Sequence, residues 1–553
     1  LTTISLLQQN FAFTQTTLWF RGGQWANQAP AAGGSSASFL FRGVGLAPSS
    51  GRASVQFASA PLVAGEGGAI ASKNRGILPW ALVDLNYSGP FTTNLSFVTP
   101  GAIGNNVRPL DPGEYEIDPT VFGGTAQNVA TNSNVLLTAL SGGSLAMTAN
   151  TQRNSLTIEG NAGLALADGV QFNLRSGGIL VRPGSTSTIS GGVLNQVSSL
   201  SGFNIWTVGD LTISSSLAGG NGIGNGAPSL VKAGAGTLTI APVASTINGL
   251  GAIGTNTMSG LLAINEGTVK FGATNAIQAN NYFSAIGGTL DLNGKSQLFW
   301  GVFTESTITN RGTLITSNNG HGHFLVNADN TARQLAARVT GDVSFTRSGQ
   351  NTLNLWGASD YTGETLINGG LTVMYGDAAF SGTSALNISY ANLYLDNKNS
   401  LVDNTNRIND NAVVNLRQGY LEFRGREQAF SFENLGTVNL VGGNSFLYSV
   451  IGGSGDNTAT LRLGNLVRNV GGGTVNFSTG TTNQVVITQL NGVAATAASV
   501  LTNGTLGGWA VHGTNGSGAS HFASYSDTLG VGALGALGFP AYSPAVIVAN
   551  SSL

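Results

Sequence analysis

The chain has no cysteine and few charged residues. Asp, Glu, Lys and Arg make up 9% of its 553 residues, against roughly 25% in ordinary soluble proteins. The absence of cysteine excludes disulfide frameworks and thiolate zinc sites. The 23 basic residues are balanced by 25 acidic ones, for a net charge of −2. We therefore expect no strong electrostatic attraction to nucleic acid or to anionic membranes.

Long apolar runs are also missing. The most apolar late segment, residues 529–542, is interrupted by four glycines and a proline, and it is shorter than the approximately 20 residues that a spanning helix needs. We predict no transmembrane helix. The first residues, Leu1, Thr2 and Thr3, include no starting methionine and no basic region before an apolar stretch. The sequence is therefore interpreted as a processed or trimmed chain.

The chain is rich in glycine, with 81 residues, and in short segments where apolar and polar residues alternate. Period-two alternation with β-branched residues is typical of strands with one buried face. Such segments lie at residues 155–159, 210–214, 289–293, 391–395, 437–440 and 474–477. Glycine pairs between them permit the positive φ angles of tight corners. No long stretch has a 3.6-residue period, and the best helical candidate, residues 331–339, is short.

Two phrases occur twice. Residues 231–240 return as residues 346–355, each with a basic residue, a glycine turn and an alternating strand, and residues 260–267 return as residues 363–370. Repeated short strands joined by glycine turns build solenoids, in which each unit buries its apolar edge against the next. The phrases recur at unequal intervals because the first copy carries an insertion, which excludes a propeller with its nearly fixed period.

We therefore predict an all-β fold, a parallel β-helix with glycine-rich corners and little helix. If each coil takes about 20–29 residues, the chain makes roughly 19–28 coils. An insertion at a corner does not disturb the coils on either side of it, so a β-helix accommodates the unequal spacing.

The chain divides into three predicted modules. Residues 1–130 form an N-terminal β-rich module, in which residues 10–14 are a possible assembly strand. Residues 131–480 form the parallel β-helix. Residues 481–553 form a C-terminal β-rich module that echoes residues 50–120.

The echo between the two ends rests on a Trp-Ala segment. Residues 77–83 resemble residues 505–511, and each segment is followed by a Ser/Thr-rich strand that contains a phenylalanine, Phe97 or Phe522. We interpret both ends as carrying the same submodule.

At the repeated phrases the chain resembles the autotransporter-associated β-strand repeat proteins, a family of large bacterial surface proteins with passenger regions. The matching run is Arg347, Gly349, Thr352, Leu353, Tyr361, Thr362, Gly363, Thr365, Ile367, Gly370, Leu371 and Val373. The copy that begins at Lys232 lacks the tyrosine. The resemblance implies a right-handed parallel β-helix, export, and an extracellular or bacterial cell-surface location, and it implies no particular activity.

Candidate metal and catalytic residues are few. His321 and His323 would share one strand face, but no carboxylate or cysteine lies beside them, so we expect an exposed loop and no metal site. The nearest carboxylate cluster is Asp403, Asp410 and Glu422 around Arg407, Arg417 and Arg424. In a charge-poor solenoid we interpret these as surface ion pairs, and we predict no catalytic residue and no cofactor.

Two further patterns are interpreted as structural. The segment Gly294-Lys295-Ser296 imitates the end of a phosphate-binding loop, but the earlier glycine is missing and no helix follows, so we predict a β-corner. Asparagine is frequent at strand ends, and stacked asparagines can satisfy one another's amides along a solenoid. We predict such stacking for Asn404, Asn406, Asn409 and Asn411.

These patterns favour a noncatalytic extracellular β-helix in a surface filament, stalk or layer, which assembles head to tail as a homopolymer through its open ends. The alternative is a monomeric adhesin or carbohydrate-binding passenger. In that case Trp300, Trp356, Tyr375 and Tyr394 would stack on surface glycans, but we favour the interpretation that these residues fill the core. An enzyme acting on polysaccharides ranks third.

Overall fold

The strands form a parallel β-solenoid. The computed structural model describes residues 2–5, 39–42, 69–84, 95–101, 107–118, 132–138, 143–197, 202–219, 228–243, 245–246, 252–253, 258, 260–285, 287–303, 314–328, 333–398, 402–514 and 518–543. Of the described residues, 56% lie in strands and 2% in helix, and the strands form about 13 solenoid turns. This confirms the all-β parallel fold and the scarcity of helix. The turns fall into two compact units, Leu1–Gly322 and His323–Leu553.

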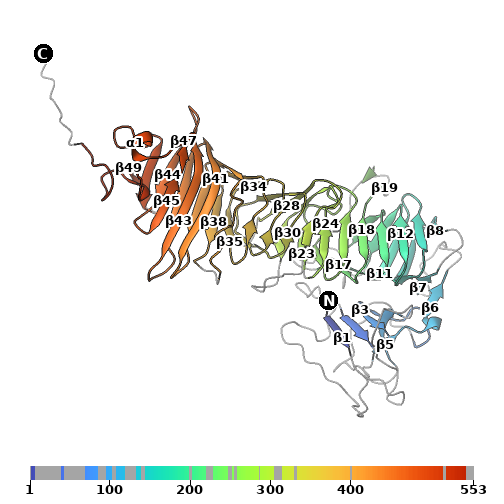
Figure 1. Cartoon of the computed structure of the whole chain (residues 1–553). Coiled ribbons are helices and arrows are strands. Elements are labelled where there is room, and N and C mark those ends of the chain that lie inside the picture. The colour runs from blue at the N-terminus through green and yellow to red at the C-terminus, as the bar shows by residue number, and fades with distance from the viewer. Residues whose placement is uncertain are drawn as a thin grey trace, which may run out of the picture. The chain divides into compact units, whose positions relative to one another are not determined.

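The first unit contains two long parallel sheets (Figure 1). The first sheet runs through β6 (Tyr115–Ile117), β7 (Asn134–Leu137), β9 (Thr151–Ile158), β11 (Gln171–Val181), β14 (Phe203–Thr207), β17 (Pro228–Ala233), β21 (Leu261–Ile264), β23 (Tyr282–Ala285) and β26 (Gly301–Phe303). Beside this path, β13 (Val193–Gln196) pairs with β11, and β16 (Ser216–Gly219) pairs with β13. The second runs through β8 (Ser144–Met147), β10 (Gly163–Leu166), β12 (Thr186–Ser190), β15 (Asp210–Ile213), β18 (Thr237–Ile240), β22 (Thr268–Phe271), β24 (Thr289–Asp291) and β27 (Leu314–Thr316).

Alternation decides which residues enter the interior of these coils. In the first sheet the register places Val135, Leu156, Ile179 and Ile205 directly over one another, and all four side chains are fully buried. Each coil therefore buries its apolar edge only against its neighbours, as a solenoid requires.

The insertion in the first motif copy lies at a corner. It contains a small antiparallel hairpin of β19 (Ser245–Thr246) and β20 (Ala252–Ile253). On either side of it β17 still pairs with β21, and β18 with β22. The coils thus keep their register around the inserted segment.

An antiparallel meander packs on the outer face of the first sheet. It consists of β3 (Leu78–Asp84), β4 (Ser96–Pro100) and β5 (Val107–Pro109), and β3 extends in parallel to β2 (Phe39–Arg42) and β1 (Thr2–Ser5). Leu82 and Phe97 of the meander share one buried cluster with Leu136, Leu180 and Trp206 of the coils.

Polar contacts fix the meander in place. Trp206 Nε1 donates to the Pro79 carbonyl at 2.9 Å, and Arg182 Nε donates to the Leu95 carbonyl at 3.0 Å. Arg108 forms a buried two-pronged ion pair with Glu114, at 2.6 Å for each contact. Glu114 lies in a single 3-10 turn, Pro112–Glu114. Burial alone would raise the pKa of Glu114, but the hydrogen bonds from Arg108 and from backbone N–H groups lower it.

The second unit repeats the two-sheet plan. One sheet runs through β28 (Gly322–Asn327), β31 (Val343–Ser348), β34 (Thr365–Asn368), β37 (Ala385–Ser389), β39 (Val413–Arg417), β41 (Phe430–Gly442), β43 (Thr458–Val467), β45 (Asn483–Ile487), β46 (Gln489–Leu490) and β47 (Val493–Ala494). The other runs through β29 (Arg333–Leu335), β32 (Leu353–Leu355), β35 (Leu371–Met374), β38 (Asn392–Asp396), β40 (Tyr420–Arg424), β42 (Asn444–Val450), β44 (Thr474–Ser478), β48 (Ala510–Thr514), β49 (Gly518–Ser526) and β50 (Gly530–Ala533). The short strands β33 (Ala358–Ser359) and β36 (Ala379–Phe380) pair on a third side.

The last strands of the second unit change from parallel to antiparallel. β48 pairs in parallel with β44, whereas β49 and β50 follow it in antiparallel order, and a single helical turn, α1 (Ala497–Val500), lies before them. Tyr525 of β49 donates its hydroxyl to the Ile487 carbonyl at 2.7 Å. The echo between the two ends has a structural counterpart, because Leu82 pairs with Phe97 and Val511 pairs with Phe522, both in antiparallel hairpins.

Two expectations need correction. The helical candidate at residues 331–339 is wrong, since its described residues contain strands Arg333–Leu335 and Arg338–Val339. The pairing of Arg333 with Leu353 overrides the local helical pattern. The prediction of roughly 19–28 coils is also too high, because β3, β4 and β5 form a meander outside the coils.

Other expectations stay open. The possible assembly strand at residues 10–14 lies outside the described residues. The division at residues 130 and 480 remains a prediction. Within the described part of the chain, no helix is long and apolar enough to cross a membrane.

The meander predicts a local effect of Trp206→Ala. Removing the indole deletes the hydrogen bond to Pro79 and leaves a cavity, so we expect the contact between meander and coils to lose about 3–5 kcal/mol. Hydrogen exchange of residues 78–84 and 96–100 should accelerate, while exchange in β9 and β11 stays slow. Trp509→Ala is the control. If exchange in the Trp206 variant changed equally in the meander and in β9 and β11, the packing of the meander on the coils would be contradicted.

Candidate functional site

Both copies of the repeated motif place a basic residue inside the solenoid. Lys232 follows Ile205 and precedes Ile264 in one interior column of the first unit. Arg347 is in register with Ile367 in the second unit. Both basic side chains are fully buried, in positions that neighbouring coils fill with isoleucine.

The buried Lys232 binds the carbonyl oxygens of two consecutive corners. Its Nζ donates to Ala233 at 3.1 Å and Gly234 at 2.5 Å in its own corner, and to Glu266 at 2.9 Å in the next. Three acceptors match the three N–H donors of an ammonium group. Burial lowers the pKa of Lys232 to about 7, against the opposing effect of the Glu266 and Asp210 carboxylates.

Arg347 makes the same connection in the second copy. Its guanidinium donates to the carbonyls of Gly349 at 2.7 Å and of Asn351 in its own corner, and to those of Gly369 and of Leu371 at 3.2 Å in the next corner. Burial lowers the pKa of Arg347 to about 10, so it stays charged near neutrality. We call Lys232 and Arg347, with these carbonyls, the corner clamps.

The corner clamps explain why the second repeated phrase ends in glycine. A Cβ on Gly267 would lie 2.7 Å from Lys232 Nζ and 2.4 Å from the Gly234 carbonyl. A Cβ on Gly370 would lie 2.4 Å from Arg347 Nη2. Both glycines also have positive φ, +70° and +56°. The basic residue of one phrase and the glycine of the other are therefore parts of a single contact.

The carboxylate cluster does not form one site. Asp403 accepts from Ser431 Oγ at 2.7 Å, Glu422 pairs with Arg424 at 2.5 Å, and Asp410 is exposed at a corner. Arg417 is likewise exposed. The carboxylates of Asp403 and Glu422 are therefore each held by other side chains of the fold.

Arg407 corrects the expectation of surface ion pairs. It is fully buried and donates to the Ala378 carbonyl at 2.8 Å and the Asp396 carbonyl at 3.1 Å. The sequence reasoning missed Glu433, whose carboxylate accepts the backbone N–H groups of Arg407 and Ile408 at 3.0 and 2.8 Å. Burial raises the pKa of Glu433 to about 8.

The histidines and the candidate phosphate loop have structural partners. His323 lies in β28 and shares a hydrogen bond of 2.8 Å with the Thr346 hydroxyl, while His321 is exposed. In the described residues no group of three or more His, Cys, Asp or Glu side chains could hold a metal ion. Gly294 has a φ of +74° at the corner between β24 and β25 (Ser296–Phe299), which confirms a β-corner.

Asparagines stack on a strand face and not at the corner that we expected. Asn439 donates to Asn415, and Asn415 donates to Asn387, each at 2.8 Å. At the corner, the side chains of Asn404 and Asn409 accept the backbone N–H groups of Asn406 and Asn411. The mechanism is confirmed, and the predicted positions are wrong.

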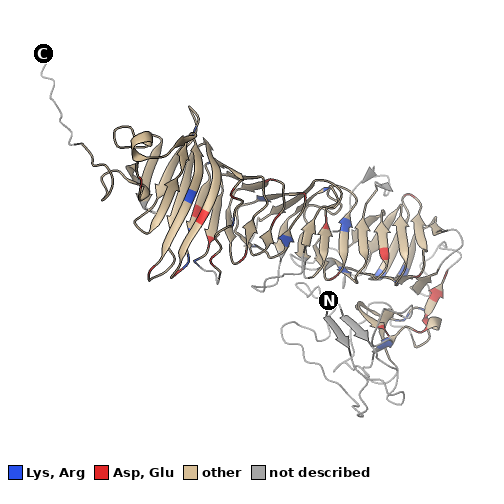
Figure 2. Cartoon of the chain, in the orientation of Figure 1, with Lys and Arg blue, Asp and Glu red and all other residues tan. Residues whose placement is uncertain are grey.

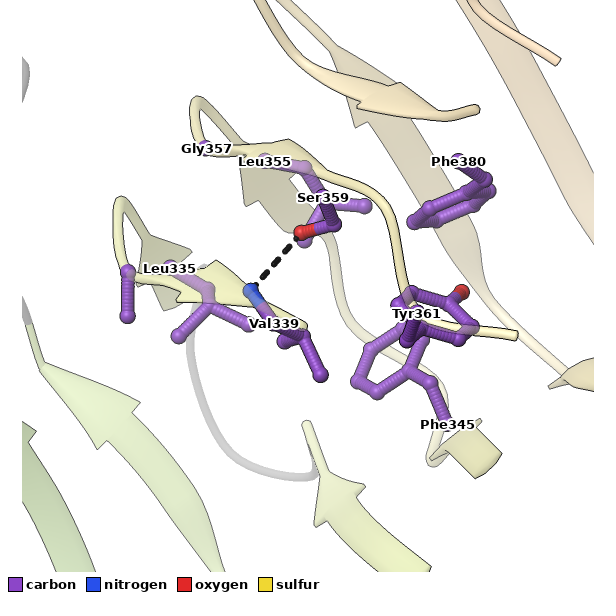
Figure 3. A pocket seen from close by; sticks show the side chains of 9 residues that line it. Leu335, Val339, Phe345, Leu355, Gly357, Ser359, Tyr361 and Phe380 are labelled. Atoms are coloured by element: carbon purple, nitrogen blue, oxygen red, sulfur yellow. Dashed lines mark hydrogen bonds between the residues drawn. The ribbon is translucent and has the colours of Figure 1, made fainter. Parts of the chain in front are cut away.

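A narrow gap lies in the interior of the second unit (Figure 3). It is lined by Leu335, Ala337, Val339, Phe345, Leu355, Gly357, Ser359, Tyr361 and Phe380. The Val339 N–H donates to Ser359 Oγ at 3.0 Å across it. The space accommodates about one water molecule, so it is a packing gap within the coils.

The four aromatic residues proposed as glycan platforms have different surroundings. Trp300 packs against Val231, Leu261, Ala263 and Tyr282 and is partly buried. Trp356 stacks on Tyr375 with ring centroids 4.9 Å apart. Tyr394 lies on the outer face of β38 under the Arg424 guanidinium, which is 3.9 Å from the ring centroid.

Sequence reasoning missed the neighbours of Tyr394. Tyr394 lies 5.7 Å from Tyr420, and Tyr420 lies 5.5 Å from Phe446 and 5.0 Å from Tyr448, between ring centroids. We call these four residues the outer aromatic strip. A signal existed in the alternating pattern of each strand, but only the register aligns residues that are more than twenty positions apart.

Charged residues are sparse on the coils of both units (Figure 2). The outer aromatic strip is one place where they gather. Arg424 binds Glu422 at 2.5 Å and Asp396 at 3.2 Å, and the Tyr420 hydroxyl donates to Glu422. The strip therefore combines aromatic rings with an ordered polar network.

The fold and these features define a parallel β-solenoid with buried basic groups at its corners. The chain is 27% identical over 256 residues to the adhesin BmaC autotransporter of Brucella suis biovar 1 (strain 1330), a match that covers 46% of this chain and 6% of that protein. It is 24% identical over 279 residues to outer membrane protein B of Rickettsia japonica (strain ATCC VR-1363 / YH), covering 48% of this chain and 15% of that protein. No protein-family model and no solved structure matches the chain.

Together with the β-solenoid, these relatives fit a passenger-type surface protein of the autotransporters. An extracellular or cell-surface location fits the same relatives. Since the matches span a small part of each relative, the activities and partners of the whole proteins do not transfer directly to this chain.

The corner clamps predict that Gly370→Ala destabilises the second unit. The new methyl group would meet the Arg347 guanidinium at 2.4 Å, in addition to the cost of a positive φ. Gly376→Ala is the matched control, because its φ of +54° is nearly the same and its Cβ would meet only the Trp356 ring at 3.6 Å. We expect the urea midpoint to fall further for Gly370→Ala, and equal midpoints would contradict the clamp.

Lys232 predicts a pH-dependent stability. Its pKa is about 7 in the folded chain and about 10.4 when unfolded, so the unfolded state holds the extra proton between these values. The destabilisation from burying the charge is complete below pH 7 and is lost as the pH rises toward 10.4. Hydrogen exchange of residues 228–271 at pH 6 to 9 should show this rise in stability, and Lys232→Met should remove it.

Lys232→Met should also lower the free energy of unfolding of these coils by about 3 kcal/mol, because the corner carbonyls lose their donor. Lys270→Met is the control, since Lys270 is only partly buried on the neighbouring strand β22. A similar loss in both variants, or an unchanged pH dependence in Lys232→Met, would contradict the role of Lys232.

Proposed function

We propose that the chain is a noncatalytic extracellular structural protein, a β-helical segment of a bacterial surface stalk. The observation that carries this proposal is the corner clamp. Buried basic groups connect consecutive corners in both units, at Lys232 and at Arg347, which fixes the coils from within. Such a device serves rigidity, since its basic groups are fully buried between the coils.

A stalk is better supported than a head-to-tail filament. The filament hypothesis depends on open coil ends whose unpaired backbone accepts another rung. In the described residues β44 pairs with β48, and the antiparallel strands β49 and β50 continue that sheet. A second copy would have to add to an antiparallel strand or displace one, so we rank homopolymerisation second.

An adhesive passenger is the further candidate. One relative is named an adhesin, and the outer aromatic strip supplies partly exposed rings on a coil face. An enzyme is less well supported, because Asp403 and Glu422 each engage separate hydrogen-bond partners and Asp410 is an exposed corner residue.

Surface location and assembly state test this proposal. On intact cells that produce the protein, we expect a membrane-impermeant lysine reagent or an antibody to label the chain without permeabilisation. The purified chain should sediment as one species over a hundredfold range of concentration. Labelling only after permeabilisation would contradict the proposal, and concentration-dependent growth into rods would favour the filament.

A further inference from the structure

The outer aromatic strip faces away from the solenoid interior. On β38, β40 and β42 the residues Leu393, Leu421 and Leu447 stack inward and are fully buried. Tyr394 and Tyr420 alternate with these leucines, so they lie on the outer face. The rings therefore do not fill the core, which was the competing interpretation of Tyr394.

The rings of the strip follow the coils from strand to strand. Tyr394, Tyr420 and Phe446 lie on three successive strands and remain partly exposed, whereas Tyr448 is 3% exposed beneath them. Neighbouring centroids are 5.0 to 5.9 Å apart. Because each coil contributes one strand to this sheet, the partly exposed rings form a row along the solenoid axis.

The row extends toward Trp356. The pKa of Tyr375 is raised by its burial and by the nearby Asp396 carboxylate, and Arg424 opposes this effect. Tyr375 thus lies within reach of the charged groups of the strip, and Trp356 stacks on it. The buried Nε1 of Trp356 has no hydrogen-bond partner in the described structure.

Ordered polar groups lie between the rings. Glu422 is 2% exposed and accepts from both the Tyr420 hydroxyl and Arg424. Asn476 Nδ2 donates to the Tyr448 hydroxyl at 3.3 Å. The tyrosine hydroxyl groups thus supply hydrogen-bond donors and acceptors beside the apolar faces of the rings.

We propose that the outer aromatic strip binds an uncharged linear polysaccharide that lies along the solenoid axis. Aromatic faces contact the apolar faces of sugar rings, while the tyrosine hydroxyl groups at the ring edges form hydrogen bonds with the sugar hydroxyls. This inference rests on the proposed surface location, since it requires access to external glycans.

Two features exclude other occupants. The strip carries two carboxylates, Asp396 and Glu422, against one guanidinium, Arg424, and this balance disfavours nucleic acid and acidic glycans. The strands β38, β40 and β42 are paired on both sides, so an extended peptide cannot add to them as a further strand.

Titration of the full chain with uncharged oligosaccharides tests the proposal. The probes are hexamers of glucose, mannose and N-acetylglucosamine, with heparin as the anionic comparison, followed by calorimetry and by intrinsic fluorescence. We expect at least one uncharged hexamer to bind, with heparin at least tenfold weaker. Tyr420→Ala should weaken binding at least tenfold and Tyr420→Phe about threefold, because the second variant removes only the hydroxyl group.

Tyr390→Ala is the matched control, since Tyr390 is 65% exposed at a corner outside the strip, and we expect less than a twofold change. If Tyr420→Ala does not fold, Tyr394→Ala replaces it, with equal urea midpoints as the criterion. Three outcomes would each overturn the proposal. The chain could bind none of the hexamers, it could bind heparin in a way that Arg424→Gln abolishes, or it could self-associate in a way that Tyr420→Ala abolishes. A surface-labelled chain that binds no hexamer would refute only this inference, whereas a hexamer-binding chain that is not labelled would refute the surface location.

Discussion

The coils depend on donors for the carbonyl groups that turn inward at the glycine corners. A parallel ladder pairs the strands, but a sharp corner leaves carbonyls outside the ladder in a space that water does not reach. Lys232, Arg347 and Arg407 supply N–H groups to these oxygens from fully buried positions. Without them the motif would combine tight corners with unsatisfied acceptors. The next corner therefore requires glycine, because that corner packs directly against the buried basic group and leaves no room for a Cβ.

The general architecture could be predicted because its causes are local. Alternation fixes which side chains face inward, and glycine marks where the chain turns. The segment at residues 331–339 failed because its apolar spacing also fits strands, and only the pairing of Arg333 with Leu353 decides between the two. The register of paired strands cannot be predicted from a local pattern, because the partners lie far apart in the sequence and the coils differ in length.

The same limit explains what could be predicted of the candidate site. Tyr394 was identified from its strand, whereas Tyr420, Phe446 and Tyr448 join it only through the stacking of successive coils. Arg407 was placed at the surface because most isolated charges in such a chain are solvated. Its burial is intelligible only with the Ala378 and Asp396 carbonyls in view. Interior columns thus determine stability, and outer faces of the same strands remain available for recognition.

The hairpin of β19 and β20 has an evolutionary consequence. It is inserted at one corner while the flanking strands keep their partners, so the energetic effect of extra sequence is confined to its own neighbourhood. Corners are therefore sites at which new loops can be grafted and diversified without redesign of the scaffold. A surface exposed to changing selection can vary there, coil by coil, while the buried cations preserve the frame.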